Sequence, residues 1–291
     1  MNTKTKKRNG KRRSTAFILF IILIIAAVCV AGVFFFVWKS GLRYLKISMD
    51  DGSSIKFYGY AEEDAVGNFV PLSGTLYFSD GSTAEINGET HTVSYSNGNV
   101  YEGELDNLLK NGKGKLHYAN GDTYEGDFVY DELTGSGRFT YANGDVYEGE
   151  LVRGKKQGFG TYTWTDGSIY IGNFANDMKN GEGKYVWTDG SYYEGSYTDE
   201  VKNGKGVYYF SNGDTYEGDF VSDVRTGKGT YTWANGESYT GDFVDNKMSG
   251  WGVYTWPTGR SYSGYFENGK IVRVSDETTG TETDAPETVN P

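Results

Sequence analysis

Carboxylates are the residues of this chain best suited to chemistry, and they recur at regular spacing: Glu102, Glu104, Glu125, Asp127, Glu148, Glu150, Glu217 and Asp219. A glycosidase needs two carboxyl groups about 5–10 Å apart in a cleft, in unequal environments. Here the acids occupy alternate residues of repeated segments, several of them opposite Lys or Arg, which is typical of solvated strand faces. We therefore predict no catalytic residue and expect that the protein is not an enzyme.

Candidate metal ligands are few. The chain has two histidines, His91 and His117, and a single cysteine, Cys29, which excludes a disulfide framework and a cysteine-based zinc site. Turns such as ANGD at 119–122 could suggest calcium, but turn chemistry explains their Asn-Gly and Asp-Gly pairs. The recurring G-x-G pairs open strands, so they are a backbone requirement and no nucleotide fingerprint. We expect neither a metal nor a cofactor.

A 23-residue period dominates the sequence. Eight tyrosines follow this spacing without a slip: Tyr101, Tyr124, Tyr147, Tyr170, Tyr193, Tyr216, Tyr239 and Tyr262. Most open a phrase such as YEGEL or YEGDF, and a G-x-G pair follows eleven residues after each of the first seven. Such self-similarity indicates a repeat architecture. Seven full units occupy 101–261, and a terminal half unit occupies 262–270.

Alternation within each unit predicts strands. In YEGEL (101–105) the first, third and fifth residues share one face and the glutamates share the other, which is a period of two. A hairpin register that pairs Glu125 with Arg138 also pairs Asp219 with Lys228, placing opposite charges across the strands. The expected fold is all-β: an elongated antiparallel sheet of tandem 23-residue β-hairpins, with an odd-length loop or a bulge between repeats.

Glycine and aromatic residues share one face of this sheet. The register pairs Gly103 with Gly114, and each later repeat repeats the pair, so that a glycine column runs along the array between Tyr, Phe and Trp. Two interpretations stay open: aromatic rings cover the glycines, or the column is an open, aromatic-walled groove. The candidate ligand- or partner-binding residues are Tyr147, Trp164, Tyr170, Trp187, Tyr193, Tyr216, Trp233, Tyr239 and Trp256.

An apolar segment precedes the repeats. Residues 16–38 carry no charge and, as a helix, span about 34 Å, enough for a hydrocarbon core of about 30 Å. A signal peptide has a shorter apolar region, so we expect an uncleaved, single-pass transmembrane helix. Seven Lys or Arg precede the segment and three follow it. The positive-inside rule then keeps the basic tail 1–15 in the cytoplasm and places the repeats on the extracytoplasmic side of the cell membrane.

Charge and composition set the remaining boundaries. Residues 1–49 hold ten of the 28 basic residues and no acid, so the remaining 18 meet all 39 acids, a net charge of −21. A body this acidic repels nucleic acids and anionic lipid surfaces. We expect 39–46 to be a juxtamembrane linker and 47–100 to be two or three degenerate, capping repeats. Residues 271–291 are expected to add a last short strand and a disordered acidic tail.

The repeated unit resembles the MORN (membrane occupation and recognition nexus) repeat, whose phrase YEG[ED]F precedes a G-x-G pair and an Asn-Gly or Asp-Gly turn on a 23-residue period. The resemblance covers 101–270. This chain departs from it at positions that are usually acidic in the family: Ile171, Asn173, Ser196, Thr240, Ser263 and Tyr265. The resemblance implies twisted hairpin arrays that act as interaction or membrane-associated modules.

Two functional expectations follow. The first is a non-catalytic, membrane-anchored, extracytoplasmic scaffold that binds a protein or peptide through its aromatic/glycine face or its acidic outer face. The second is a module that binds a cell-surface glycan or a quaternary ammonium group of the cell wall, because aromatic cages bind such cations. In both cases residues 16–38 contact the lipid bilayer, and no nucleic acid is expected as a partner.

Overall fold

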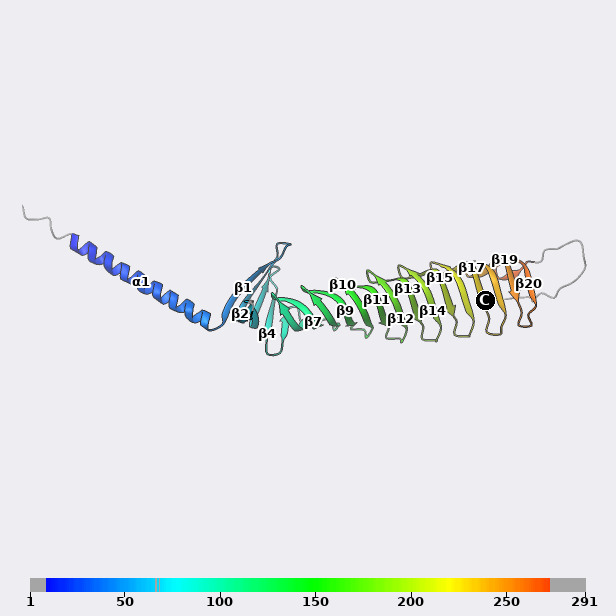
Figure 1. Ribbon diagram of the computed structural model, residues 1–291, viewed down its shortest axis with the longest axis horizontal. Helices are drawn as coiled ribbons and strands as arrows, with labels where there is room; N and C mark the ends of the chain where they lie inside the picture. Colours follow the sequence, from blue (N-terminus) through cyan, green and yellow to red (C-terminus); the bar gives the residue numbers. More distant parts are fainter. Residues whose placement is uncertain (1–8, 66, 68, 273–291) are drawn as a thin grey trace, which may run out of the picture. The chain divides into compact units, whose positions relative to one another are not determined.

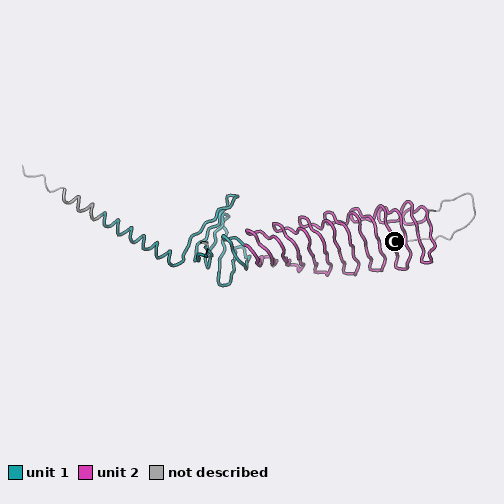
Figure 2. The backbone as a smooth tube through the Cα atoms, in the orientation of Figure 1, with its two compact units in different colours: residues 1–110 teal, residues 111–291 magenta. Residues whose placement is uncertain are grey.

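The computed structural model describes residues 9–65, 67 and 69–272, which form one helix followed by antiparallel strands (Figure 1). The chain divides into two compact units, residues 1–110 and 111–291 (Figure 2). The all-β fold with one N-terminal helix is confirmed. The expected acidic tail after residue 274 lies outside the described residues.

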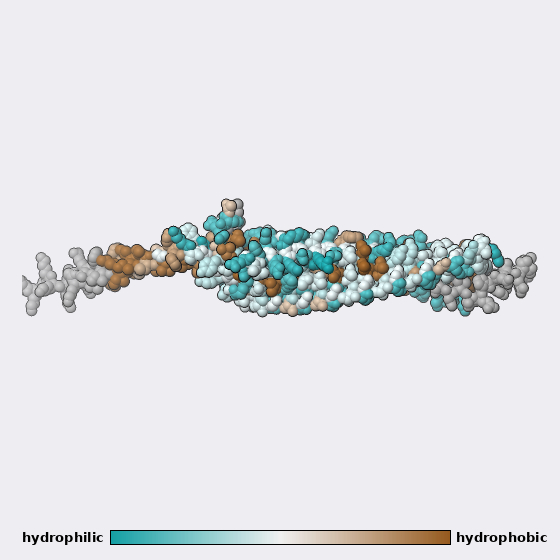
Figure 3. All heavy atoms as spheres, turned by 90° about the horizontal axis from the view of Figure 1, so that it is seen from below, coloured by the Kyte–Doolittle hydropathy of each residue, from teal (hydrophilic) through white to brown (hydrophobic). Residues whose placement is uncertain are grey.

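Helix α1 (Asn9–Lys39) contains the apolar segment, and Leu19–Lys39 is long and apolar enough to cross a membrane. A signal sequence near an N-terminus has the same properties. None of this stretch is buried inside the protein, and it forms the brown surface of Figure 3, where the strands are mostly teal and white. Strand β1 (Leu42–Ser48) begins after only Ser40 and Gly41, so regular structure starts within the segment expected to be a linker.

Unit 1 continues with strands joined in sequence order: β2 (Ser54–Glu63), β3 (Phe69–Phe78), β4 (Thr83–Asn87), β5 (Thr92–Tyr95) and β6 (Val100–Asp106). Side chains on β2 alternate between buried and exposed. Ile55, Phe57 and Leu76 lie on the buried face and form the core of this unit. Period-two alternation therefore produces a sheet with one apolar face and one solvent face.

Unit 2 contains most of the repeats. Its strands are β7 (Leu109–His117, which begins at the unit boundary), β8 (Thr123–Val129), β9 (Glu132–Thr140), β10 (Val146–Val152), β11 (Lys155–Thr163), β12 (Ile169–Ala175), β13 (Met178–Val186), β14 (Tyr192–Thr198), β15 (Val201–Tyr209), β16 (Thr215–Val221), β17 (Val224–Thr232), β18 (Ser238–Val244), β19 (Lys247–Thr255), β20 (Ser261–Glu267) and β21 (Lys270–Ile271). Each full repeat supplies a seven-residue and a nine-residue strand, and each strand from β8 to β20 pairs with the strand before it and the strand after it.

Two kinds of connection alternate along the array. The turn inside each hairpin has two residues, as at Asn176 and Asp177, whose φ angles of 49° and 73° are those of a type I′ turn. Five-residue loops such as 118–122 join one repeat to the next, which confirms the expected odd length. In that loop Gly121 has a φ of 96° and donates its N–H to the Tyr118 carbonyl at 3.0 Å.

The register is partly as expected. Glu125 lies opposite Arg138, and the six glycine pairs from 126/137 to 241/252 are present. The expected pairing of Asp219 with Lys228 is wrong. A bulge after Gly218 places Asp219 opposite Thr226 and leaves Lys228 to pair with the following repeat.

Candidate binding surfaces

Tyrosine rings cover the glycine column on the aromatic face. The first tyrosine of each repeat is buried, and its hydroxyl donates a hydrogen bond to a carbonyl three residues later, as from Tyr147 to Glu150 at 2.7 Å. A Cβ atom added to Gly160 would lie 2.7 Å from the Tyr147 ring, too close for any side chain. The glycines are therefore needed to let these rings lie flat on the backbone.

The nine candidate residues fall into two groups on this face. Five tyrosines are fully buried, with 0 % of their surface exposed: Tyr147, Tyr170, Tyr193, Tyr216 and Tyr239. The tryptophans Trp164, Trp187, Trp233 and Trp256 are half-buried. The structure therefore leaves the tryptophans accessible and encloses the tyrosines, and the binding role of all nine stays a prediction.

The tryptophans belong to a continuous series of rings that we name the aromatic ladder: Tyr162, Trp164, Tyr185, Trp187, Tyr208, Phe210, Tyr231, Trp233, Tyr254 and Trp256. Successive ring centroids are 4.5–5.6 Å apart, within the range of favourable aromatic contacts. The two ring positions of each repeat are separated by one residue, and the 23-residue period brings each pair beside the next.

The protein's own cations occupy the spaces between these rings. Lys156, Lys179, Lys202 and Arg225 recur on the 23-residue period. The Lys202 Nζ lies 5.4–5.7 Å from the ring centroids of Trp187, Tyr193 and Tyr208, a cation–π geometry. Burial lowers the pKa of this ammonium group. Sequence reasoning missed the cations, although their spacing was visible, and they fill the cages that a quaternary ammonium ligand would need.

Opposite the aromatic ladder, the polar face of the same sheet carries a groove of about 810 Å³. Its floor is the backbone of the glycine column, from Gly195 to Gly252. Because glycine has no side chain, the floor lies lower than the residues on either side of it. Lys205 and Val207, for example, project from the same face of the strand beside Gly206. The sequence indicated this acidic face as one of two candidate surfaces but gave no sign that it is hollowed.

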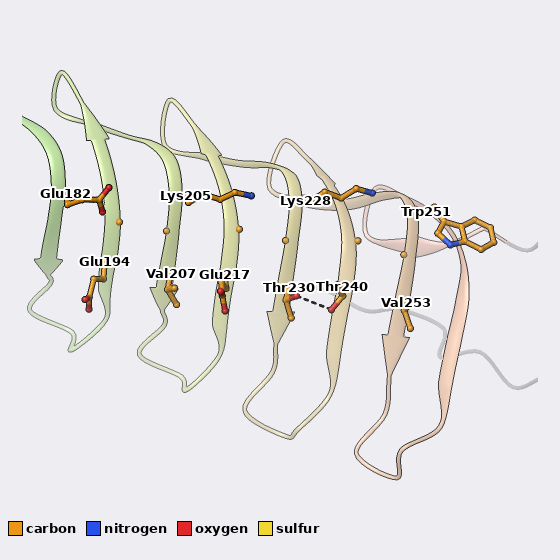
Figure 4. Close-up of a pocket in the computed structure, with 16 residues that line it drawn as sticks. Glu182, Glu194, Lys205, Val207, Glu217, Lys228, Thr230, Thr240, Trp251 and Val253 are labelled. Atoms are coloured by element: carbon orange, nitrogen blue, oxygen red, sulfur yellow. Dashed lines mark hydrogen bonds between the residues drawn. The ribbon is translucent and has the colours of Figure 1, made fainter.

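Two rows of side chains form the walls of the groove at different levels of the strands (Figure 4). Wall A consists of Glu182, Lys205, Lys228 and Trp251. Wall B consists of Glu194, Val207, Glu217, Thr230, Thr240 and Val253. Wall A therefore ends in an aromatic side chain, and wall B changes along its length from charged to uncharged residues.

The groove has an acidic end and an apolar end. Lys205 and Lys228 are neutralised by Asp219 and Asp242, at 2.6 and 2.7 Å. Within the described part of the chain, no Lys or Arg forms an ion pair with Glu217 in the groove. Hydrogen bonding to the Lys205 ammonium lowers the pKa of Asp219, so that carboxyl is ionised at neutral pH.

Glu182, like Glu217, has no ion pair with a Lys or Arg among the described residues. Its carboxylate accepts a hydrogen bond from Ser196 Oγ at 2.6 Å. At the other end of the groove, Trp251 packs edge-on against Tyr265, with centroids 5.3 Å apart, and both rings are 53 % exposed. The arrangement can attract a cation at one end and take up an apolar group at the other.

The titratable residues show no arrangement for metal chemistry. Over residues 9–65, 67 and 69–272, no group of three or more His, Cys, Asp and Glu side chains is placed to hold an ion. The outer carboxylates lie in cross-strand rows with bases, for example Glu148, whose Oε1 is 2.8 Å from Arg138 Nη1. These contacts are those of solvated surface ion pairs.

Comparison with solved structures finds low similarity to two related domains. The TCP domain of SAS-4 (dCPAP) from Drosophila melanogaster, in complex with a proline-rich motif of Ana2 (dSTIL), is 17 % identical, with a TM-score of 0.36 over 54 % of this chain and 85 % of that one. The TCP10 domain of Danio rerio CPAP is 14 % identical, with a TM-score of 0.37 over 76 % of this chain and 100 % of that one. TM-scores this low do not establish a common overall fold.

A search of curated proteins gave no significant match. The MORN repeat family model, in contrast, matches seven consecutive segments: 101–123, 124–146, 147–169, 170–192, 193–215, 216–238 and 239–259. Each segment begins at the second residue of a seven-residue strand, and together the segments cover more than half of the 291 residues. The chain therefore belongs to the MORN repeat family.

Proposed function

We propose that this protein is a non-catalytic scaffold, anchored in the cell membrane by α1, whose MORN repeats bind a protein or peptide partner outside the cytoplasm. The observation that supports binding is the groove on the polar face, a concave surface with converging charged and aromatic side chains. Sites of this kind are the default place for a ligand. The partner we propose is an extended segment, because a glycine floor lets another backbone approach closely.

The charges and apolar groups of the groove define the partner's chemistry. Glu182 and Glu217 attract Lys or Arg side chains, since neither is neutralised by a basic neighbour. Trp251, Tyr265 and Val253 accept an aromatic or aliphatic side chain, and exposed aromatic pairs of this kind commonly supply most of the binding energy. The proposed segment is therefore basic at one end and carries an apolar anchor at the other.

Photocrosslinking tests the surface. A photoreactive amino acid replaces Val207 or Val253 in the full chain expressed in cells, and Val129, which lies outside the groove, is the matched control. We expect one partner to crosslink from both groove positions and not from Val129. Crosslinks from Val129 alone would contradict the assignment.

Affinity measurements with the recovered partner test the chemistry. Glu217→Lys should weaken binding at least tenfold, equivalent to about 1.4 kcal/mol. Glu125→Lys changes the same repeat position outside the groove and should have little effect. Equal losses for both variants would mean that the groove is not the binding surface.

One observation favours a glycan as the alternative ligand: the tryptophans of the aromatic ladder are half-exposed along one face. Sugar rings stack on such surfaces, and a glycan array probed with the full chain distinguishes the two ligands. Trp187→Ala should abolish glycan binding and leave crosslinking from Val207 unchanged.

The orientation is part of the proposal and rests on the excess of Lys and Arg before the apolar segment. Protease added to intact cells should remove the repeats and spare an N-terminal tag. Cleavage that occurs only after lysis would place the repeats in the cytoplasm.

A further inference from the structure

Exposed tyrosines gather on one face of the strands that directly follow α1. Tyr44, Tyr58, Tyr60 and Tyr77 are 46–61 % exposed, whereas the first tyrosine of most repeats is completely buried. Tyr44 lies directly opposite Tyr58, and Tyr77 lies opposite Lys56, so the side chains project from the same face of β1–β3. We name this surface the tyrosine face.

The tyrosine face has no covering element among the described residues. The opposite face of the same strands holds the core, where Ile55, Phe57 and Leu76 are buried. A phenol ring is an apolar body with a polar tip, which suits a boundary between water and hydrocarbon. The face therefore has the properties of an interfacial surface.

Two lysines lie on this face in an unfavourable arrangement. Lys46 is directly opposite Lys56, and both are exposed. Neither forms an ion pair with an acid of the described chain. Like charges directly opposite each other in a sheet are destabilising unless an anion lies between them. An anionic group from outside the protein would relieve this repulsion.

A short connection holds the tyrosine face near the end of α1. Only Ser40 and Gly41 separate the helix from β1. Arg43 Nη1 donates a hydrogen bond to the Trp38 carbonyl at 2.8 Å, and its guanidinium lies 5.3 Å from the Phe69 ring centroid. Four strand residues span about 13 Å, so Lys46 lies within reach of a bilayer surface at the helix end.

We infer that the tyrosine face rests on the outer leaflet, with Lys46 and Lys56 binding the phosphate groups of lipid headgroups and the tyrosines in the interfacial layer. Tyr, Trp and Lys are the residues that favour this layer. The inference rests on the membrane-spanning part of the proposed function and is independent of the groove. It assigns lipid contact to strands outside the MORN repeats, although the acidic remainder of the chain repels anionic surfaces.

Fluorescence quenching by lipid tests this inference. Full-length chains carrying Cys29→Ser and Tyr58→Cys are labelled with a fluorophore and placed singly in nanodiscs of phosphatidylcholine and phosphatidylglycerol with nitroxide-labelled headgroups. Tyr265→Cys is the matched control, because both tyrosines are 53 % exposed. We expect quenching at position 58 to be at least threefold that at position 265. Equal quenching at the two positions would overturn the inference.

A charge change tests the role of the lysines. Lys46→Glu with Lys56→Glu should lower quenching at position 58 by at least half, whereas Lys247→Glu with Lys270→Glu, an equal charge change on exposed lysines of unit 2, should leave it unchanged. Equal effects of both double variants would overturn phosphate binding. A chain that does not remain in the nanodisc would instead contradict the anchor itself, and loss of partner binding alone would affect only the groove.

Discussion

Lys202 and Asp223 are joined twice: the main-chain N–H of Lys202 donates to Asp223 Oδ1 at 3.0 Å, and the Lys202 ammonium lies 3.6 Å from the same oxygen. The residues are 21 apart, so these contacts tie one repeat to the next. Lys179 is also joined twice to Glu200: its main-chain N–H donates to Oε1 at 2.7 Å, and its ammonium lies 3.2 Å from Oε2. Neighbouring repeats are therefore held by side chains as well as by the strand ladder.

The first prediction concerns this connection. Asp223→Ala leaves a main-chain N–H and a half-buried ammonium without their acceptor, which should cost about 1–3 kcal/mol of unfolding free energy. Asp223→Asn is the matched control, because Asn246 accepts the equivalent bond from Arg225 at 2.9 Å. Denaturant unfolding checks both variants. A loss for Asn as large as that for Ala would show that charge, and not the acceptor, dominates.

The second prediction concerns the glycine column. Gly160→Ala places a Cβ atom 2.7 Å from the Tyr147 ring, and overpacking of this kind typically costs 1–3 kcal/mol. If contact with the ring causes this loss of stability, Gly160→Ala should destabilise a Tyr147→Leu chain less than it destabilises the original chain. A double-mutant cycle followed by thermal unfolding measures the difference. Additive effects would mean that the ring and the glycine are not coupled.

The third prediction concerns alkaline pH. Burial raises the pKa of Tyr124, Tyr216 and Tyr239 to about 12, above the ordinary value of about 10. The unfolded chain loses these phenol protons at a lower pH than the folded chain does. The contribution of the buried, neutral phenols to the free energy of unfolding is therefore complete below pH 10 and is lost as the pH rises towards 12. Phenolate absorbance and circular dichroism should change together in this range. Ionisation of these tyrosines in an intact sheet would contradict their burial.

The fourth prediction concerns modularity. Deleting residues 147–169 joins Val146 to Tyr170 and keeps every side chain on its face, so a shorter folded array should result. Deleting 147–168 removes one residue fewer. The strand that contains Tyr170 is then shifted by one residue along its partner strand, so its buried side chains move to the solvent face. Circular dichroism and limited proteolysis compare the two chains. Equal damage would contradict a modular register.

Much of the fold follows from spacing alone. The 23-residue period and the alternation around residues such as Tyr101 determine strand number, faces and the pairing of Glu125 with Arg138. The local backbone geometry could not be predicted from the sequence in the same way. Tyr130 and Asp131 form a tight turn with φ angles of 48° and 72°, although neither is glycine, and the bulge beside Asp219 depends on contacts that span two strands.

The candidate site was only partly predictable. The sequence placed Trp187 and Tyr193 on one face but could not show that Tyr193 lies flat on the glycines while Trp187 keeps an exposed edge. The spacing of Lys156, Lys179, Lys202 and Arg225 was visible, but Leu133 and Met248 at the adjoining repeat positions limit the series to four repeats, and nothing in the sequence placed these cations against aromatic rings. The groove beside Gly206 is lined by residues of several successive strands, and the bulges after Gly195 and Gly218 change the register in a way that the spacing of the repeats does not reveal.

The sequence-order pairing of strands in unit 2 has a mechanical consequence. From β8 to β21 each strand pairs with the strand before it, so a force applied between β7 and β21 acts along the hydrogen bonds that join the strands. Such a load opens the bonds strand by strand from an end, and each repeat that opens releases roughly 75 Å of chain. A protein fixed at one end and pulled at the other would therefore lengthen in steps, one repeat at a time. The opened repeats would pair again when the tension falls.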